Sequence, residues 1–325
     1  MTASREHDLI ARYFAPLAGP EGLGLLDDAA LLTPMPGHEW VVTADALVAG
    51  VHFFAHDPAG QIAAKALRVN LSDLAAKAAT PRGFTLSLAL PHDTPARWIK
   101  AFAKGLGDDM ARYGIKLIGG DTVATPGPLC IALTAFGEVA TGQMVKRSTA
   151  RAGDAIYITG TIGDSALGLK CLMKTISPRL AAHHRRYLVS RYRLPEPRLA
   201  LRGALEAFAS AAMDVSDGLV GDLAKLLAAT GRGGAMLLDA IPLSPAAQAA
   251  VALDASAFAT ALTGGDDYEI LATVPKEACK AFEQASAAAN VRVTQIGVVR
   301  ARVGVVWRDG DGHKVTFSSS AYSHF

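Results

Sequence analysis

The chain has 325 residues, half of them apolar, with 32 basic residues against 30 acidic ones and a net charge of +2. This length exceeds one typical core and predicts two domains. The small net charge, without any basic–aromatic block, argues against nucleic-acid binding. Cys130, Cys171 and Cys279 stand apart, and the charged first 14 residues resemble no export signal. We therefore expect a cytoplasmic protein that neither spans nor crosses a membrane.

Apolar runs rich in β-branched residues predict strands, in chain order, at 40–45, 84–90, 130–139, 155–159, 235–239, 268–274, 294–299 and 303–308. Amphipathic spacing predicts a short N-terminal helix and further helices at 62–79, 95–113, 196–209, 217–230 and 275–290. Because the two kinds of element do not alternate strictly, the pattern indicates an α+β (mixed α/β) fold. The polar segment 141–153 predicts a boundary between domains 1–140 and 141–325.

Aspartate recurs beside Gly, Ser or Thr next to these apolar runs. The instances are Asp27-Asp28, Thr43-Ala44-Asp45, Asn70-Leu71-Ser72-Asp73, Gly119-Gly120-Asp121-Thr122, Asp214-Val215-Ser216-Asp217-Gly218 and Gly264-Gly265-Asp266-Asp267. A single cluster is more often a turn or a helix cap. Six clusters instead predict carboxylates that converge around Mg²⁺ and polyphosphate, because converging carboxylates repel without cations. We expect Asp45, Asp73 and Asp121 to share one such cage.

Two further segments leave alternatives open. Residues 160–168, GTIGDSALG, follow a strand and open a helix, but their spacing fits neither the dinucleotide fingerprint nor the P-loop. A phosphate at the helix N-terminus and tight helix–strand packing are both compatible with these glycines. Residues 191–198, RYRLPEPR, predict a structured turn, either a helix start or part of an anion site. Arg147 suits a phosphate clamp, although an exposed arginine near a linker is commoner.

Taken in order, these motifs resemble the thiamine-monophosphate kinase family, in the superfamily of aminoimidazole ribonucleotide synthetase and selenophosphate synthetase. The resemblance covers nearly the whole chain, through LLDDAALL, VVTADALVAGVHF, NLSDLAAKAATPRG, LIGGDT, TGTIGDSALGLK, RYRLPEPRLALR, MDVSDGLVGDLAKL, LTGGDDYEILATVP and AYSHF. It implies two domains, with an N-terminal sheet domain that forms a homodimer and a C-terminal α/β domain that completes the active site. It also implies that thiamine monophosphate is phosphorylated to thiamine diphosphate with ATP and several Mg²⁺ ions.

Matching positions imply three groups of site residues. Those implied as metal ligands are Asp27, Thr43, Asp45, Asp73, Asp121, Asp214 and Asp217. Those implied as nucleotide contacts are Gly120, Asp121, Arg147 and Ser216, and those implied as substrate contacts are His52, Asp266 and Tyr322. Asp45, Asp121 and Asp217 are expected to carry catalysis. None of these residues is an obvious covalent nucleophile, which favours direct in-line transfer.

Three positions depart from the family pattern. Leu26 stands where the family usually has Gly, and Asp266 stands where Glu is common. Ala103-Lys104 replaces a common aromatic, so no nucleotide contact is assigned there. One alternative is another ATP-using synthetase of the superfamily, although a selenide enzyme is expected to have a reactive cysteine nearer the N-terminus than Cys130. A non-catalytic metal or nucleotide sensor is a second alternative, which the full set of acidic clusters disfavours.

Overall fold

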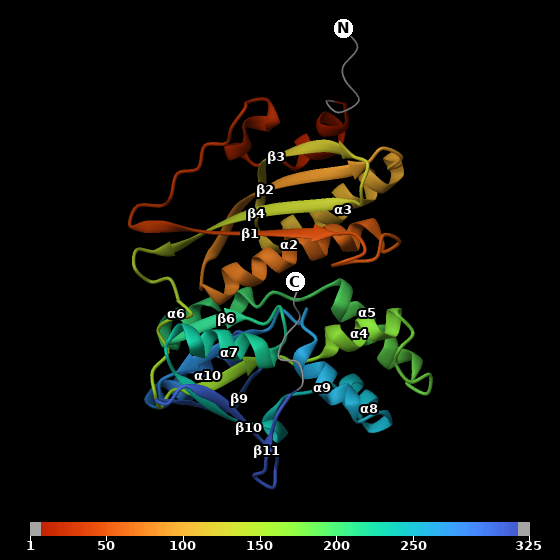
Figure 1. Ribbon diagram of the computed structural model, residues 1–325. Helices are drawn as coiled ribbons and strands as arrows, with labels where there is room; N and C mark the ends of the chain where they lie inside the picture. Colours follow the sequence, from red (N-terminus) through yellow and green to blue (C-terminus); the bar gives the residue numbers. More distant parts are fainter. Residues whose placement is uncertain (1–7, 318–325) are drawn as a thin grey trace. The chain divides into compact units, whose positions relative to one another are not determined.

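The computed structural model describes residues 8–317 (Figure 1). Backbone contacts divide the chain into two compact units. The first contains residues up to Leu74 together with Ala79–Gly142, and the second contains Ala75–Ala78 and the chain from Gln143 onward. Among the described residues, no helix is long and apolar enough to cross a membrane.

The first unit begins with irregular helical turns and continues as a sheet with two long helices. Its elements are η1 (Ile10–Phe14, a π-helix), η2 (Ala15–Leu17), η3 (Pro20–Leu25), β1 (His38–Val48), α2 (Ala59–Ala76), β2 (Thr80–Pro91), α3 (Ala96–Tyr113), β3 (Lys116–Thr125) and β4 (Cys130–Ala140). The strand order is β1-β4-β2-β3, in which β2 and β3 run parallel and the other neighbours run antiparallel. Gly114 ends α3 in the left-handed conformation (φ 67°), as its position in the sequence predicts.

One face of this sheet is buried and the other is open. Leu86 and Leu133 are buried, whereas their strand neighbours Ser87 and Ala132 are exposed. The buried face packs against α2 and α3, whose side chains form the core of the unit. The two helices meet at Gly60 and Gly105, where a Cβ on Gly105 would lie 2.4 Å from the Cα of Gly60. Glycine is therefore required at this helix crossing.

The second unit contains the remaining elements. These are β5 (Ala155–Thr159), α4 (Asp164–Leu172), α5 (Ala182–Arg193), η4 (Leu199–Leu201), α6 (Arg202–Phe208), β6 (Ala211–Asp214), α7 (Leu219–Ala229), β7 (Gly233–Leu237), η5 (Leu238–Ala240), α8 (Pro245–Leu253), α9 (Ser256–Thr263), β8 (Ile270–Val274), η6 (Lys276–Ala278), α10 (Cys279–Ala288), β9 (Val293–Arg300), β10 (Gly304–Arg308) and β11 (Lys314–Val315). The described strands form a sheet of order β11-β10-β7-β9-β5-β8-β6. Only β7 and β10 pair in parallel within this sheet as described.

Both faces of this second sheet are covered. Every residue of β5 is buried, and Ile156 and Ile158 belong to a core that includes Leu223 of α7. Tyr157, on the other face, packs in a core with Phe282 of α10. A third cluster joins α4, α5, α8 and α9. The central strands are thus buried on both faces, which explains their continuous apolar runs.

The predicted mixed α/β class is confirmed, as is the predicted helix that contains Asp73, but two predicted settings are wrong. Asp45 does not end its strand, because pairing with β4 continues from His38 to Val48. Asp121 lies inside β3, which pairs with β2 on both sides of it. Backbone pairing continues on both sides of these polar residues, so residue type alone does not predict where their strands end.

Candidate functional site

Two acidic residues of the first unit come together between β1 and α2. The Thr43 hydroxyl donates a short hydrogen bond to the Asp73 carboxylate. Burial raises the pKa of Asp45 to about 6, and the negative charge of Asp73 adds to the rise. A nearby cation stabilises the ionised form of a carboxyl group that is costly to ionise in this way. The donor set of two carboxylates and a hydroxyl consists of the hard oxygen ligands that Mg²⁺ prefers.

His52 lies just after β1, in a turn that backbone contacts hold in place. Its Nδ1 accepts a hydrogen bond from the Val48 backbone N–H at 3.0 Å, so this nitrogen carries no proton. The buried Lys65 donates to the His52 carbonyl at 2.9 Å. These contacts fix the backbone and the ring orientation, and the Nε2–H of this tautomer is the donor that a ligand would meet.

A second acidic group of the same unit surrounds a pocket of about 240 Å³ beside β3. Asp27, Asp28 and Asp121 line it together with apolar side chains that include Phe14. Gly120 belongs to the lining at φ 151°, and a Cβ there would lie 1.9 Å from the carbonyl oxygen of Leu86. Only glycine fits here, because any side chain would collide with the backbone of β2. The pocket combines an apolar wall with carboxylates, which suits a nucleotide and its metal.

The strand register separates Asp121 from the β1–α2 pair. Asp45 of β1 pairs with Leu133 of β4, which in turn pairs with Leu86 of β2. Leu86 pairs with Gly120 of β3, so Asp45 and Gly120 are aligned across the sheet. Asp121 is aligned instead with Ser87, on the other face of the sheet. The expected single cage of Asp45, Asp73 and Asp121 is therefore not formed within this unit. Asp45 and Asp73 lie together, whereas Asp121 joins Asp27 at the pocket.

In the second unit, the loops DVSDG (214–218) and GGDDYE (264–269) are joined through their backbones. The Val215 N–H donates to the Glu269 carbonyl at 2.8 Å, and the Val215 carbonyl accepts from Tyr268 N–H at 2.8 Å. The Asp266 N–H donates to the Ser216 carbonyl at 2.7 Å. This pairing brings together the two backbone segments that carry Asp214, Ser216, Asp217 and Asp266.

The turn at Gly264–Tyr268 holds non-glycine residues in the left-handed region. Asp266 has φ 65° and Tyr268 has φ 51°. Such backbone is rare for a bulky residue and tends to occur at functional sites. The Tyr268 hydroxyl donates to Oδ1 of Asp266 at 3.2 Å, which orients the carboxylate. Sequence reasoning named Asp266 but missed this tyrosine, two residues further along.

Asp217 has a cationic neighbour that sequence reasoning also missed. Lys225 of α7 forms ion pairs with Asp217 and with Asp222, the latter at 2.9 Å. Burial raises the pKa of Asp222, and Lys225 opposes that rise. Burial alone would lower the pKa of Lys225, but hydrogen bonds to the two carboxylates raise it overall. Lys225 is therefore charged at neutral pH.

The N-terminus of α4 is occupied by a carboxylate of the protein itself. Asp267 is buried and accepts hydrogen bonds from Gly163 N–H at 2.7 Å and Ser165 N–H at 3.3 Å. Burial raises its pKa well above the usual range. A Cβ on Gly163 would lie 2.1 Å from that of Ala261, and one on Gly168 would lie 2.2 Å from the Leu188 carbonyl. The structure thus favours tight packing over a phosphate site at these glycines.

Two arginines of residues 191–198, Arg191 and Arg198, bind an internal anion. Glu269 is fully buried and accepts from Arg198 at 2.6 and 2.5 Å, from Arg191 at 3.2 Å and from the Thr159 hydroxyl at 2.6 Å. This network anchors the end of the GGDDYE loop to β5 and α5. From the sequence, these arginines could belong to a helix start or to an anion site. The sequence did not identify Glu269 as the anion, because it lies more than 70 residues away.

Known proteins resemble this chain in sequence and in fold. The AIR synthase related protein models match residues 26–139 (N-terminal domain) and 151–308 (C-terminal domain). The thiamine-monophosphate kinase of Caulobacter vibrioides is 43% identical over 297 residues, which cover 90% of this chain and 83% of that protein. The crystal structure of the Stenotrophomonas maltophilia K279a thiamine-monophosphate kinase is 38% identical with a TM-score of 0.81, covering 90% of this chain and 91% of that one.

The chain belongs to the thiamine-monophosphate kinase family.

A further structure from the thiamine-monophosphate kinase family, AaThiL complexed with AMPPCP and TMP, is 30% identical with a TM-score of 0.79. It covers 92% of this chain and 91% of its own.

The family resemblance also implies Arg147 as a nucleotide contact and Tyr322 as a substrate contact. Arg147 lies exposed in the turn after β4, and Tyr322 lies outside the described residues.

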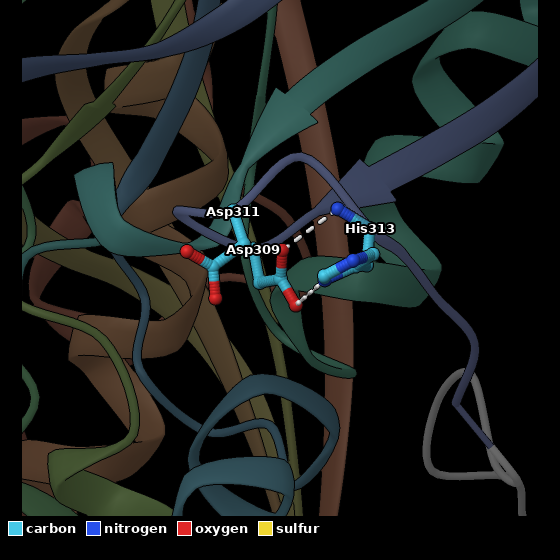
Figure 2. Close-up of side chains that lie close together, drawn as sticks. All are labelled: Asp309, Asp311 and His313. Atoms are coloured by element: carbon cyan, nitrogen blue, oxygen red, sulfur yellow. Dashed lines mark hydrogen bonds and ion pairs between the residues drawn. The ribbon is translucent and has the colours of Figure 1, made fainter.

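One group of possible metal ligands lies apart from the family motifs, in the hairpin between β10 and β11 (Figure 2). Asp309, Asp311 and His313 approach one another there on an exposed turn. The Asp309 carboxylate accepts from the His313 backbone N–H at 2.8 Å, and the ring Nδ1 lies 3.5 Å from it. These contacts close the turn by joining Asp309 to His313.

Proposed function

We propose that this protein transfers the γ-phosphoryl group of ATP directly to thiamine monophosphate, forming thiamine diphosphate. The proposal is supported by relatives named thiamine-monophosphate kinase and by a related ThiL structure complexed with AMPPCP and TMP. The structural observation that carries it is the backbone pairing of the DVSDG and GGDDYE loops, which gathers Asp214, Ser216, Asp217 and Asp266. We propose that an N-terminal domain (1–140) binds the nucleotide and the metal and that a C-terminal domain (141–325) completes the active site.

The residue roles follow the chemistry of each group. We assign Mg²⁺ ligation to Asp27, Thr43, Asp45, Asp73, Asp121, Asp214 and Asp217. We assign nucleotide binding to Gly120, Asp121, Arg147 and Ser216, and binding of thiamine monophosphate to His52, Asp266 and Tyr322. We assign the catalytic role to Asp45, Asp121 and Asp217, whose carboxylates would hold Mg²⁺ ions that offset the phosphate charge. The supporting observations are the crowded Asp45–Asp73 pair and the acidic pocket beside β3.

The reaction must bring two polyanions together. Several Mg²⁺ ions, when bound, would supply the positive charge that offsets this repulsion. The acceptor phosphate of thiamine monophosphate is already anionic at neutral pH, so the chain needs no strong base. The paired loops hold Asp217 and Asp266 at fixed positions, which favours an in-line approach. Without a covalent protein intermediate, the protein contributes positioning and electrostatics.

The open face of the first sheet supports a homodimer. Val42 is 56% exposed and Val123 is 50% exposed. The exposed Ala44, Ala46 and Ala132 belong to the same face by strand register. Apolar side chains on an exposed sheet face are unfavourable in water, and burying them lowers the free energy. We therefore propose that the first unit pairs with a second copy of this chain through this face.

The function is tested by incubating the purified protein with ATP, MgCl₂ and thiamine monophosphate and resolving the thiamine esters by chromatography. We expect thiamine diphosphate and ADP in equal amounts, and none when ATP or Mg²⁺ is omitted. Asp121→Asn should reduce turnover by about 10²-fold or more, the effect typical of one lost electrostatic contact, with the fold retained. ADP formation without thiamine diphosphate, or conversion without Mg²⁺, would contradict the proposal.

A further inference from the structure

Lys225, Asp222 and Asp217 form a closed set of contacts at the start of α7. The Lys225 ammonium pairs with the carboxylates of Asp217 and Asp222, the latter at 2.9 Å. The other carboxylate oxygen of Asp222 accepts a hydrogen bond from the Asp217 backbone N–H at 2.8 Å. Asp222 is fully buried, whereas the side chains of Lys225 and Asp217 are 44% and 38% exposed. The set therefore has a fixed inner member and two outer members that solvent reaches.

Both oxygens of Asp222 are engaged, one by Lys225 and one by the Asp217 N–H. Asp222 is thus unsuited to bind a metal and instead orients its neighbours. It lies three residues before Lys225, so it faces the lysine across one helical turn. This buried anion holds the Lys225 ammonium beside Asp217, where a divalent cation is also proposed to bind.

We propose that the Lys225 ammonium, which pairs with Asp217, competes with a divalent ion for this carboxylate. The inference rests on the proposed function, because it takes Asp217 as a metal ligand. Two cations held by one carboxylate repel each other, so the ammonium must weaken divalent binding or move away. Lys225 is accordingly a positioning residue: its ammonium balances the charge of Asp217 and holds this carboxylate in place before the Mg²⁺-bound nucleotide binds.

If Lys225 competes with the metal, replacing it should strengthen metal binding, whereas replacing a purely structural lysine should not. Lys225→Met should bind Mn²⁺, measured without nucleotide by electron paramagnetic resonance of the free ion, about 3- to 10-fold more tightly at the Asp217 site. Its Tm in EDTA should fall, because Asp217 and the buried Asp222 lose their cation. Lys225→Arg, which keeps the charge, should retain wild-type Mn²⁺ affinity. Lys104→Met is the matched control, since Lys104 forms a 2.6 Å ion pair with Asp108 on the surface of α3.

The Asp217 site is isolated by repeating the titration in an Asp217→Asn background, where Lys225→Met should no longer change Mn²⁺ binding. Unchanged or weaker Mn²⁺ binding by Lys225→Met overturns the inference, even if the protein converts thiamine monophosphate. A wild-type titration that Asp217→Asn leaves unaltered also overturns it, by removing Asp217 from the metal site. Failure of the proposed function is recognised separately, as the absence of thiamine diphosphate in the chromatographic assay.

Discussion

At the scale of single residues, Asp45 is a carboxyl group whose ionised form is unfavourable in this fold. Burial and the charge of Asp73 raise its pKa from 3.8 to about 6. The folded protein therefore holds this proton more tightly than the unfolded chain does, which favours folding at low pH. That contribution is complete below about pH 3.8 and is lost as the pH rises to about 6. Above this range the ionised carboxylate destabilises the metal-free fold.

We therefore expect Asp45→Asn to be more stable than wild type in EDTA at pH 7.5, by about 1–3 kcal/mol. The difference should shrink toward pH 4, where wild-type Asp45 is protonated. Mg²⁺ should raise the Tm of wild type more than that of the variant. Urea unfolding at the two pH values measures the effect, and Asp108→Asn at an exposed position is the control. A variant less stable than wild type at pH 7.5 would contradict this account.

Tyr268 is a second residue whose setting indicates a role. Its hydroxyl donates to Asp266 at 3.2 Å from a left-handed backbone position. Tyr268→Phe removes a hydrogen bond worth about 1 kcal/mol, so KM for thiamine monophosphate should rise roughly 5-fold. KM for ATP should stay near the wild-type value. Tyr157→Phe is the matched control, because Tyr157 donates to Glu283 at 2.7 Å away from the paired loops. Equal changes in both KM values would assign Tyr268 a general structural role.

At the scale of elements, the crossing of α2 and α3 depends on two glycines. A Cβ at Gly105 would lie 2.4 Å from both the Cα and the carbonyl oxygen of Gly60, a distance that backbone atoms cannot accommodate without moving. Gly105→Ala should therefore lower stability by about 1–3 kcal/mol despite the better helix propensity of alanine. Gly203→Ala in α6, where a Cβ meets nothing within 4 Å, should be neutral or stabilising. Thermal unfolding compares the two, and equal Tm shifts would contradict the packing argument.

The sequence predicted elements well where the apolar pattern and the turn residues agreed. The end of α3 at Gly114 and the fully apolar run of β5 are examples. It failed where polar residues lie within strands, as with Asp45 in β1 and Asp121 in β3. It also failed for contacts distant in sequence. Asp267 caps α4 more than 100 residues away, and no local spacing indicates that pairing.

The order of the motifs predicted candidate site residues, but it did not predict how these residues are arranged within each unit. Residue types and order identified Asp214, Asp217 and Asp266, whose loops are indeed paired. The separation of Asp121 from Asp45 depends on strand register, which moves a side chain to the other face with each single-residue step. Lys225 was missed because a lysine on a helix is ordinarily a solvated surface residue.

At the scale of the whole molecule, the open sheet face of the first unit predicts assembly. Val42→Asp places a charge in the centre of this proposed interface, and burying an unpaired charge is costly. We expect the variant to elute as a monomer in size-exclusion chromatography with light scattering, whereas wild type elutes as a dimer. Leu253→Asp, at an exposed apolar residue of α8 in the second unit, should leave the dimer intact. A wild-type monomer, or a dimeric Val42→Asp, would contradict the assignment of this face.

The central claim is that the chain passes phosphate directly from ATP to thiamine monophosphate. Rapid quenching after mixing with γ-³²P-labelled ATP and Mg²⁺, with and without thiamine monophosphate, tests it most directly. The account predicts label in thiamine diphosphate when the acceptor is present and no protein-bound label when it is absent, because none of the site residues is an activated nucleophile. A phosphorylated protein that forms with ATP alone and then passes its label to thiamine monophosphate would contradict it.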